Sequence, residues 1–491
     1  ALWLTDHQMN MLVSEEFGQY FRRLPLTQSA SIHCGNALRM DWNKVISAEQ
    51  VDYILGNPPF VGKQYQNAEQ KSDMEVVFTG VKGAGVLDYV TAWYLKAVHY
   101  VRGDEKVSAF LDNMTGTQKA PRERVKIAFV STNSITQGEQ VGVLWHELLR
   151  LGVKIHFAHR TFRWSNEARG KAAVHCVIIG FALHDTDRKT IFDYEQINGP
   201  AHAIDATNIN PYLVDAMDVV LTSRSSPVCS VPEISFGNMP NDGNNLLLSD
   251  NDKIELLKNE PSADKWIRPF MGSEEFINGI KRWCLWLVDI SPNELRNLPF
   301  VSQRIEAVRK LRLESTRKAT QKLADYPMLF GEIRQPGSQY IAIPKTSSER
   351  RTYIPVSFLS SEIIASTELF TIAGGKLFHF SVLSSAMHMA WVRYVAGRLK
   401  SDYRYSGQII YNNFPWPGDA TEKQRSTIEQ AAQALLDARA AHPDASLADL
   451  YDPVAMPPDL RRAHQALDKA VDAAYAGAGF KPAPTKSDAE R

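Results

Sequence analysis

The chain is predicted to combine an α/β domain with an α+β region and a helical tail. Residues 1–225 alternate short apolar runs with helical patterns, as a sheet covered by helices does. From Pro227 to Asn245 the chain is rich in Pro, Gly, Asn and Ser, which indicates a linker or irregular segment. Residues 226–417 mix short strands with basic loops, and residues 418–480 are Ala-rich with helical spacing. These patterns predict three domains, followed by a disordered end at residues 481–491.

Within the first domain, five apolar runs are expected to form strands. They are Ser31–Cys34, Tyr53–Leu55, Ile127–Val130, Lys154–Phe157 and Val174–Phe181. The last two are close enough in sequence to form an antiparallel hairpin at the edge of the sheet. Apolar residues at three- and four-residue spacing predict helices, and the segments concerned are Ala1–Val13, Tyr89–Val101 and Val141–Leu151.

The tail is expected to be a helical hairpin. Thr421 with Gln424, and Ser426 with Glu429, have the spacing of capping boxes at a helix start. One apolar stripe then follows Ile428 and a second follows Leu460, and the Pro-rich break at Pro453–Pro458 separates them.

Composition excludes several classes of protein. The 55 Lys and Arg balance the 55 Asp and Glu, so a nucleic-acid partner would need a local basic surface. Four cysteines lack Cys-x-x-Cys spacing, which argues against a zinc ribbon or a disulfide framework and favours a reducing cytoplasm. The longest apolar run, Val174–Leu183, is about half the ~20 residues of a membrane helix, so no membrane span is expected. Oligomeric state stays open.

The segment Asp52–Phe60 carries the most specific chemistry. Pro58 and Pro59 end the apolar run Tyr53–Leu55, which can form a buried strand, because proline has no N–H for a sheet ladder. A residue before proline is held extended, so Asn57 and Pro58 should present carbonyl oxygens with few local donors. Such a turn suits a ligand that brings only N–H donors, for example an aromatic-conjugated amine. The alternative is an ordinary strand-to-loop turn, since Asn and Pro are common turn formers.

Four motifs together resemble one enzyme family. Asn57-Pro58-Pro59-Phe60 resembles the catalytic tetrad of amino-methyltransferases that use S-adenosylmethionine, and Asn at its head resembles the adenine-N6 members. Three further segments resemble the MmeI-like (type IIL) restriction-modification enzymes: Leu87–Val90 with Trp93-Tyr94, Phe129–Ile135 and Phe157–Trp164. The resemblance extends from Ala1 to about Phe480.

The resemblance implies a site-specific adenine-N6 DNA methyltransferase with a Rossmann-like sheet and a target-recognition domain. Double-stranded DNA would be its partner and S-adenosylmethionine its cofactor, and no metal is implied. The target adenine would swing out of the duplex into the site. Asn57 and the Pro58 carbonyl would then hold its N6 amine, with Pro59 stiffening the turn and Phe60 stacking on the ring.

Cofactor contacts are implied at Asn36, Ala37 and Asn57. Many relatives have Asp where this chain has Asn36, and the alternative for Asn36 is a simple strand-end turn. Asp88 and Tyr89 are implied to face the same region, although an aspartate at a helix start is also an ordinary N-cap.

The Gly-rich cofactor loop of the family cannot be placed in this chain. Gly80–Gly85 does not follow a buried strand, so we expect only a flexible loop there. The first strand and its loop are therefore expected upstream of Ala1. On this interpretation the sequence is N-terminally truncated, and the isolated fragment would be inactive and bind little S-adenosylmethionine.

A basic region after residue 300 predicts contact with DNA. Between Val301 and Arg351 the chain has eleven Lys and Arg but only five Asp and Glu, a local excess of six positive charges. The first half, which includes Arg312, has helical spacing and is also typical of a solvated helix face. The loop residues Arg334, Lys345, Arg350 and Arg351 are the better candidates, and by resemblance Lys400 and Arg404 join them. The segment Ser401–Pro417 could instead serve aromatic packing between domains.

The sequence is also compatible with two other functions. One is a DNA-recognition fragment without catalysis. The other is a nuclease, either in this chain or upstream in a combined endonuclease-methylase. Glu69-Gln70-Lys71 matches only the last fragment of a metal-dependent nuclease motif, without an aspartate on a strand, and is predicted to be a surface loop.

Overall fold

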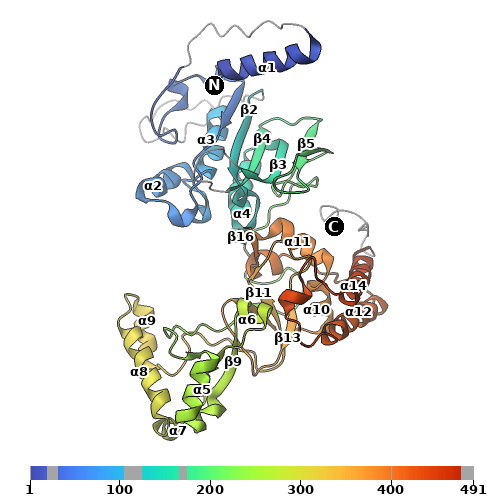
Figure 1. Cartoon of the computed structure of the whole chain (residues 1–491). Coiled ribbons are helices and arrows are strands. Elements are labelled where there is room, and N and C mark those ends of the chain that lie inside the picture. Colours follow the sequence, from blue (N-terminus) through green and yellow to red (C-terminus); the bar gives the residue numbers. More distant parts are fainter. Residues whose placement is uncertain (1, 19–30, 104–123, 165–173, 400, 477–491) are drawn as a thin grey trace.

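The structure is a computed structural model that describes residues 2–18, 31–103, 124–164, 174–399 and 401–476 (Figure 1). The predictions for Lys400 and for residues 481–491 fall outside these ranges. Figure 1 shows the sheet of the first domain in the upper part, the C-terminal helices at the lower right, and α5, α7, α8 and α9 at the bottom.

The first domain is built on a mixed six-stranded sheet with the order β1-β2-β4-β3-β5-β6. The strands are β1 (Tyr53–Gly56), β2 (Lys126–Thr132), β3 (Lys154–Trp164), β4 (Val174–Ala182), β5 (Lys189–Asp193) and β6 (His202–Ala206). β1 runs parallel to β2, so both strands end at the same edge of the sheet. β4 is antiparallel to both of its neighbours, β2 and β3.

Some expectations for this sheet are wrong. Ser31–Cys34 is exposed and pairs with no described strand, because a short run with strand propensity still needs a neighbour to complete its ladder. The antiparallel β3–β4 pair is confirmed, but it lies inside the sheet, since β5 and β6 extend the sheet beyond it. β1 forms as predicted but is not buried. Tyr53 is 66% and Leu55 75% exposed, because β1 pairs with β2 alone among the described strands.

Among its described residues the first domain contains four α-helices, which are α1 (Leu2–Phe17), α2 (Ala68–Val77), α3 (Thr91–Arg102) and α4 (Gly138–Arg150). Of these, α3 and α4 contribute most to the core of the sheet, whereas the described side chains of α1 are largely exposed. Apart from short differences at their ends, α3 and α4 confirm the predicted helices, and Tyr94 of α3 stacks on Phe181 of β4 at 5.2 Å. Gly80–Gly85 follows α2 through turns and enters the short 3-10 helix η4 (Ala84–Val86), so it does not follow a strand, and its predicted flexibility stays a prediction. Glu69-Gln70-Lys71 is in the first turn of α2 and not in a loop, because Asn67 and Gln70 form a capping box there.

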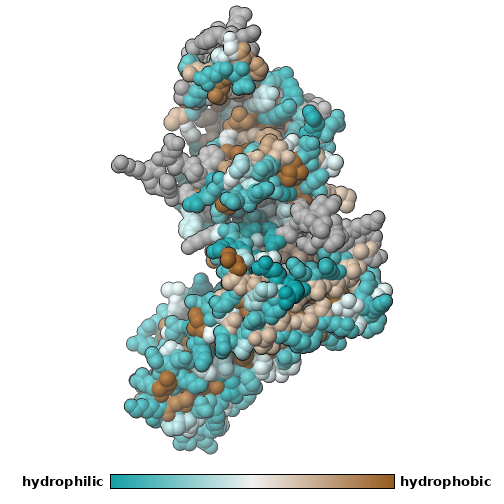
Figure 2. Space-filling model, turned by 45° about the vertical axis from the view of Figure 1, so that its right-hand side comes forward, coloured by the Kyte–Doolittle hydropathy of each residue, from teal (hydrophilic) through white to brown (hydrophobic). Residues whose placement is uncertain are grey.

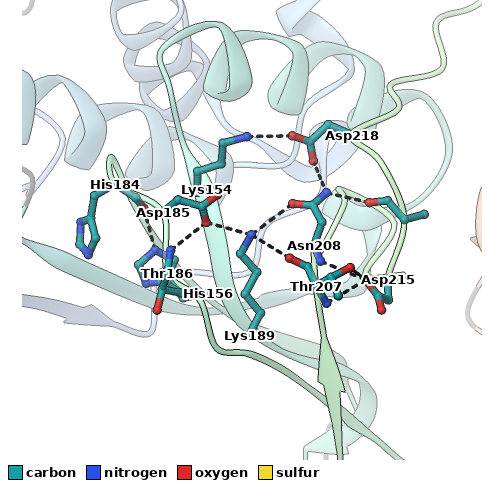
Figure 3. A network of polar contacts seen from close by, with 11 residues as sticks. Lys154, His156, His184, Asp185, Thr186, Lys189, Thr207, Asn208, Asp215 and Asp218 are labelled. Carbon is teal, nitrogen blue, oxygen red and sulfur yellow. Dashed lines mark hydrogen bonds and ion pairs between the residues drawn. The ribbon is translucent and has the colours of Figure 1, made fainter.

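A polar network fastens the segment after β6 to the strands of the sheet (Figure 3). The Lys189 ammonium of β5 is nearly buried and contacts the carboxylate of Asp185 at 2.8 Å and the carbonyl of Thr207 at 3.3 Å. Lys154 of β3 pairs with Asp218 at 3.2 Å, and Asn208 donates to the same aspartate at 3.0 Å. The hydrogen bond from Lys189 is the largest cause of the lowered pKa of Asp185. Residues 207–218 are thereby held against the sheet before the chain enters the next region.

The middle region contains three small sheets, with the orders β14-β9-β10-β8, β13-β11-β15-β7 and β12-β17-β16. The strands are β7 (Ile234–Phe236), β8 (Leu247–Leu248), β9 (Ile267–Met271), β10 (Trp283–Leu285), β11 (Tyr340–Pro344), β12 (Thr346–Ser347), β13 (Ser357–Leu359), β14 (Ile364–Ala365), β15 (Leu369–Ala373), β16 (Gly397–Leu399) and β17 (Asp402–Arg404). The helices are α5 (Asp250–Asn259), α6 (Ser273–Asn278), α7 (Pro292–Arg296), α8 (Pro299–Leu313), α9 (Lys318–Lys322), α10 (Leu377–Leu383) and α11 (Ala386–Val395).

The tail is a helical hairpin, as predicted. It consists of α12 (Glu422–Ala440), the short α13 (Leu447–Leu450) and α14 (Pro458–Ala476). Thr421 caps α12, and its capping box with Gln424 is confirmed. The second proposed box is wrong, because Ser426 lies inside α12, past the cap that Thr421 already provides.

The hydrophobic cores do not follow the order of the three regions along the chain. The main core joins the first sheet to β11, β15, α10, α11 and the tail helices. A separate core, from Leu246 to Phe330 with Ile364, belongs to the part at the bottom of Figure 1. We call residues 240–331 the outer lobe. The tail is therefore packed into the body of the protein, whereas the outer lobe must be stabilised by its own contacts.

Candidate active site and DNA-facing surface

The turn Asn57–Phe60 follows β1 directly and has no regular secondary structure. A Cβ on Gly56 would come within 3.0 Å of the Phe129 ring, so glycine lets the end of β1 lie close to β2. Pro58 is buried and Phe60 packs partly against the main core. Asn57 is exposed, and within the part of the chain that the structure describes its side chain has no hydrogen-bond partner. The turn is thus anchored at Pro58 while the Asn57 carboxamide stays available to a ligand.

Asp88 lies beside this turn and contacts the segment that follows it. One oxygen of Asp88 accepts the Lys63 N–H at 3.1 Å, and the other accepts the Ser134 hydroxyl at 2.5 Å. The Tyr89 N–H donates to the Val61 carbonyl at 2.9 Å. Asp88 does not cap α3, whose N-cap is Val90, so the simple N-cap interpretation is wrong.

Asn36 belongs to a second polar cluster, centred on the carboxylate of Asp73. Asp73 accepts hydrogen bonds from Asn36 at 2.9 Å, from Arg39 at 2.6 Å and from the Tyr89 hydroxyl at 2.6 Å. Burial raises the pKa of Asp73, but these three donors together outweigh it and leave the pKa below its ordinary value. Burial and the bond to Asp73 raise the pKa of Tyr89 to about 12.

The Asn36 carboxamide is already largely occupied. Its oxygen accepts the Leu38 N–H at 2.9 Å, and one of its amide hydrogens goes to Asp73. One N–H is left for a ligand. The Ala37 carbonyl accepts the Trp42 indole N–H at 2.8 Å, and buried Lys96 donates to the Leu38 and Met40 carbonyls at 2.7 and 2.6 Å. These bonds hold the segment after Asn36 against α3.

The proposed DNA-binding residues have different surroundings. Arg350 and Arg404 are exposed, and no described acidic side chain forms an ion pair with either. Arg334 forms an ion pair with Glu332, and Lys345 is only 17% exposed and lies 3.4 Å from Glu368. Arg351 is partly buried, and burial lowers its pKa. Arg350 and Arg404 are therefore exposed and outside the described ion pairs. The pKa of nearby Asp452 is lowered mainly by backbone N–H bonds, and the positive charge of Arg350 contributes to this shift.

Arg404 and Arg350 are close to the sheet β12-β17-β16. Arg404 of β17 lies opposite Thr346 of β12 and Gly397 of β16, and Arg350 follows β12 by three residues. This sheet touches the first domain, because a Cβ on Gly138 of α4 would lie 3.2 Å from the Cα of Gly397. Gly138 also has a φ of +61°, which favours glycine.

Arg312 contradicts the phosphate-contact interpretation of the basic helix. It is 1% exposed, and its guanidinium donates to five backbone carbonyls inside the outer lobe. It is therefore a structural residue and not part of a phosphate footprint. Its neighbours Arg309 and Lys310 remain exposed.

Several residues of the site were not found from the sequence. Asp73 and Gln140 carry no local motif, because their partners lie far away in the chain. A carboxylate on the buried face of a short helix was the available signal for Asp73, since buried acids are almost always paired.

Three family descriptions match almost the whole chain. "MmeI, DNA-methyltransferase domain" matches residues 1–193, "MmeI, target recognition domain" residues 215–418, and "MmeI, C-terminal domain" residues 420–491. Together with the mixed α/β sheet, the small antiparallel sheets and the C-terminal helices, they define a DNA-methyltransferase domain followed by a target-recognition domain and a helical C-terminal domain.

Two relatives identify the family more closely. The Type IIL restriction-modification enzyme MmeI, whose structure was solved in complex with DNA, is 49% identical, with a TM-score of 0.82 over 99% of this chain and 62% of that chain. DNA methyltransferase A of Bacillus subtilis (strain 168) is 38% identical over 494 residues, which cover 100% of this chain and 53% of the relative. The chain belongs to the MmeI-like type IIL restriction-modification family, which confirms the resemblance inferred from the motifs. It spans between 53% and 62% of the length of these two relatives. None of the described helices is long and apolar enough to cross a membrane.

Proposed function

We propose that this chain carries the catalytic and target-recognition parts of an enzyme that transfers a methyl group from S-adenosylmethionine to adenine N6 in double-stranded DNA. The observation that carries the proposal is the exposed Asn57 carboxamide, which has no partner among the described residues and stands beside the anchored Pro58 and the half-buried Phe60. An Asn at the head of the turn that has no partner among the described residues is available to hold an exocyclic amine. Its test is the Asn57→Ala substitution described in the Discussion.

The proposed mechanism is mainly one of positioning. The Asn57 side-chain oxygen and the Pro58 carbonyl accept the two hydrogens of N6, which draws its lone pair out of the ring and toward nitrogen. Phe60 stacks on the extruded base, and Pro59 limits the freedom of the turn. S-adenosylmethionine, when bound, supplies an electrophilic methyl group. The residues of this chain hold the amine in line with it.

We assign the cofactor side to Asn36 and Ala37, with Asn57 facing both substrates. Asn36 can offer one N–H, because its other hydrogen and its oxygen are bonded to Asp73 and Leu38. That donor suits a ring nitrogen of the cofactor's adenine, which is an acceptor. Asp at this position would offer only acceptors when ionised.

We assign the DNA contacts first to Arg350 and Arg404, and retain Arg334, Lys345, Arg351 and Lys400 as weaker candidates. Replacing both Arg350 and Arg404 with Ala should weaken duplex binding and reduce the slope of log K against log salt by about 2, one for each lost phosphate contact. Binding is measured by fluorescence anisotropy between low and moderate salt. Arg309→Ala is the matched control, because Arg309 is exposed but pairs with Glu306 at 3.6 Å. An unchanged slope in the double variant would remove both arginines from the interface.

The alternative function is DNA recognition without catalysis in this 491-residue chain. It is favoured by the position of β1 at the edge of the sheet among the described strands, and by Gly80–Gly85, which follow α2 and not a strand. We therefore expect calorimetry on residues 1–491 alone to detect little or no S-adenosylmethionine binding. A tight, stoichiometric titration would contradict this expectation and leave the methyltransferase as the better account of the chain by itself. A nuclease elsewhere in the whole protein is compatible with either outcome.

A further inference from the structure

Asp88 connects three parts of the site that are far apart in the sequence. Its carboxylate accepts hydrogen bonds from the Lys63 N–H, three residues after the turn Asn57–Phe60 ends, and from the hydroxyl of Ser134, just beyond β2. Its own N–H donates to the Gln140 side chain of α4 at 3.0 Å. The contacts join residues 25, 46 and 52 positions away from Asp88. One residue thus joins the segments that follow two parallel strands to the first turn of a helix.

These contacts matter most for the turn Asn57–Phe60. The turn is anchored by Pro58 on one side and continues into Val61–Lys63 on the other. That continuation is held to residues 88 and 89 by the Lys63 and Tyr89 N–H bonds, at 3.1 and 2.9 Å. Without the carboxylate of Asp88, the Lys63 N–H loses its acceptor, and the segment after the turn keeps the Tyr89 bond to Val61 and the bond from the Gln66 side chain to the Leu87 carbonyl at 3.0 Å.

Asp88 is also connected, through α4, to the target-recognition domain. Gln140, which accepts from the Asp88 N–H, is in the first turn of α4, two residues after Gly138. Gly138 packs directly against Gly397 of β16, with a Cβ-to-Cα separation of only 3.2 Å if a side chain were present. The catalytic turn is therefore linked by Asp88, Gln140 and this glycine contact to the sheet that carries Arg404.

We propose that Asp88 is a positioning residue for methyl transfer, which holds the Asn57–Phe60 turn in register with the end of β2 and the start of α4. The proposal rests on the proposed function, because it assigns Asp88 a role in the same site. Asp88 acts through its hydrogen bonds and carries no proton in the reaction. Precise placement matters because a displacement of about 1 Å at a reacting group can cost about 100-fold in rate.

Two substitutions separate positioning from proton transfer. Asp88→Ala removes both carboxylate bonds and should lower kcat by about 100-fold, with the Kd for duplex DNA changed by less than about twofold. Asp88→Asn keeps the shape, since its oxygen can accept the Lys63 N–H and its amide can donate to Ser134, so it should retain kcat within about threefold. Both are measured in the full-length protein by single-turnover methyl incorporation.

Hydrogen exchange gives a readout that needs neither cofactor nor DNA. In Asp88→Ala, exchange should become faster in Val61–Tyr65 and in Thr132–Thr136, while α12 and α14 remain as protected as in the wild type. Asp52→Ala is the matched control, because Asp52 is an exposed carboxylate at the opposite end of β1 and lies 3.6 Å from Arg124. It should change neither segment. If Asp88→Ala does not fold, Ser134→Ala removes one of the two bonds and should lower kcat about tenfold.

Each result decides the proposal. It is supported by local loss of protection, a lower kcat in Asp88→Ala and rescue by Asp88→Asn. It is overturned if protection or kcat is unchanged in Asp88→Ala, or if Asp88→Asn loses as much rate as Asp88→Ala, because the carboxylate would then carry a charge or a proton. If Asn57→Ala is active in the same assay, the proposed function fails. If Asn57→Ala loses activity but Asp88→Ala keeps the wild-type kcat and protection, only the positioning role fails.

Discussion

Replacing Asn57 with Ala is expected to lower methyl transfer by about 100- to 1,000-fold, the loss typical of removing one preorganised electrostatic group from a reacting centre. The side chain is exposed and has no partner in the described part of the chain, so its removal breaks no internal contact. The free energy of unfolding should therefore change by less than about 0.5 kcal/mol. We therefore expect Asn57→Ala to lose activity without losing stability.

The measurement is incorporation of a labelled methyl group into a duplex under single-turnover conditions, together with the Kd for the same duplex. Duplex binding should stay within about twofold, because phosphate contacts dominate affinity and Asn57 makes none of them. Gln64→Ala is the matched control. Gln64 is another exposed carboxamide, seven residues further along the chain, and its loss should leave the rate unchanged.

The outcome also distinguishes the two interpretations of the Asn-Pro-Pro-Phe turn. If the turn were only a strand end, Asn57→Ala would leave both rate and binding as in the wild type. If Asn57 served duplex recognition, the Kd would rise together with the loss of rate. Only the proposed hydrogen bond from the amine to Asn57 predicts a large loss of rate while duplex binding and stability are preserved.

Local patterns predicted the elements whose causes are local. Pro58 and Pro59 end β1 wherever the chain goes next, and the Thr421–Gln424 capping box starts α12 through bonds within four residues. The helical spacing of α4 was visible for the same reason. Ser31–Cys34 shows the limit. Its composition favours a strand, but a strand also needs a neighbour, and no described strand lies beside it.

The same distinction between local and long-range causes applies to the candidate site. The Asn57–Phe60 turn could be found because proline chemistry acts on adjacent residues. The role of Asp88 depends on Lys63, Ser134 and Gln140, which no periodicity connects to it. The sequence alone therefore left Asp88 between a functional residue and an N-cap, and only the three-dimensional contacts exclude the cap.

Arg312→Met should destabilise the outer lobe by about 3–5 kcal/mol, the usual cost of removing one side of a buried charged interaction. The guanidinium is 1% exposed and lies among carbonyls of two loops. Its bonds to Asn241, Pro240, Leu323, Tyr326 and Leu329 range from 2.8 to 3.2 Å. Met fills similar space but donates nothing, so all five carbonyls lose a donor.

Arg312→Lys should fall between the wild type and Arg312→Met. Lys keeps the charge, but its three donors come from a single nitrogen and cannot reach acceptors spread over both loops. Chemical denaturation gives the free energy of unfolding, and hydrogen exchange over residues 246–330 shows whether the loss is confined to the outer lobe. Arg309→Met is the control. Arg309 is three residues earlier on the same helix and half exposed, so its loss should cost less than about 0.5 kcal/mol.

The same variant tests whether buried Arg312 contributes to DNA binding directly. Below the unfolding temperature of Arg312→Met, the salt dependence of duplex binding should match the wild type, because a guanidinium bonded to five carbonyls has no donor left for a phosphate. A slope reduced by about 1 with unchanged stability would place Arg312 in the interface and contradict the buried structural role. Loss of stability with an unchanged slope would show that Arg312 acts through the fold of the outer lobe and not through a phosphate contact.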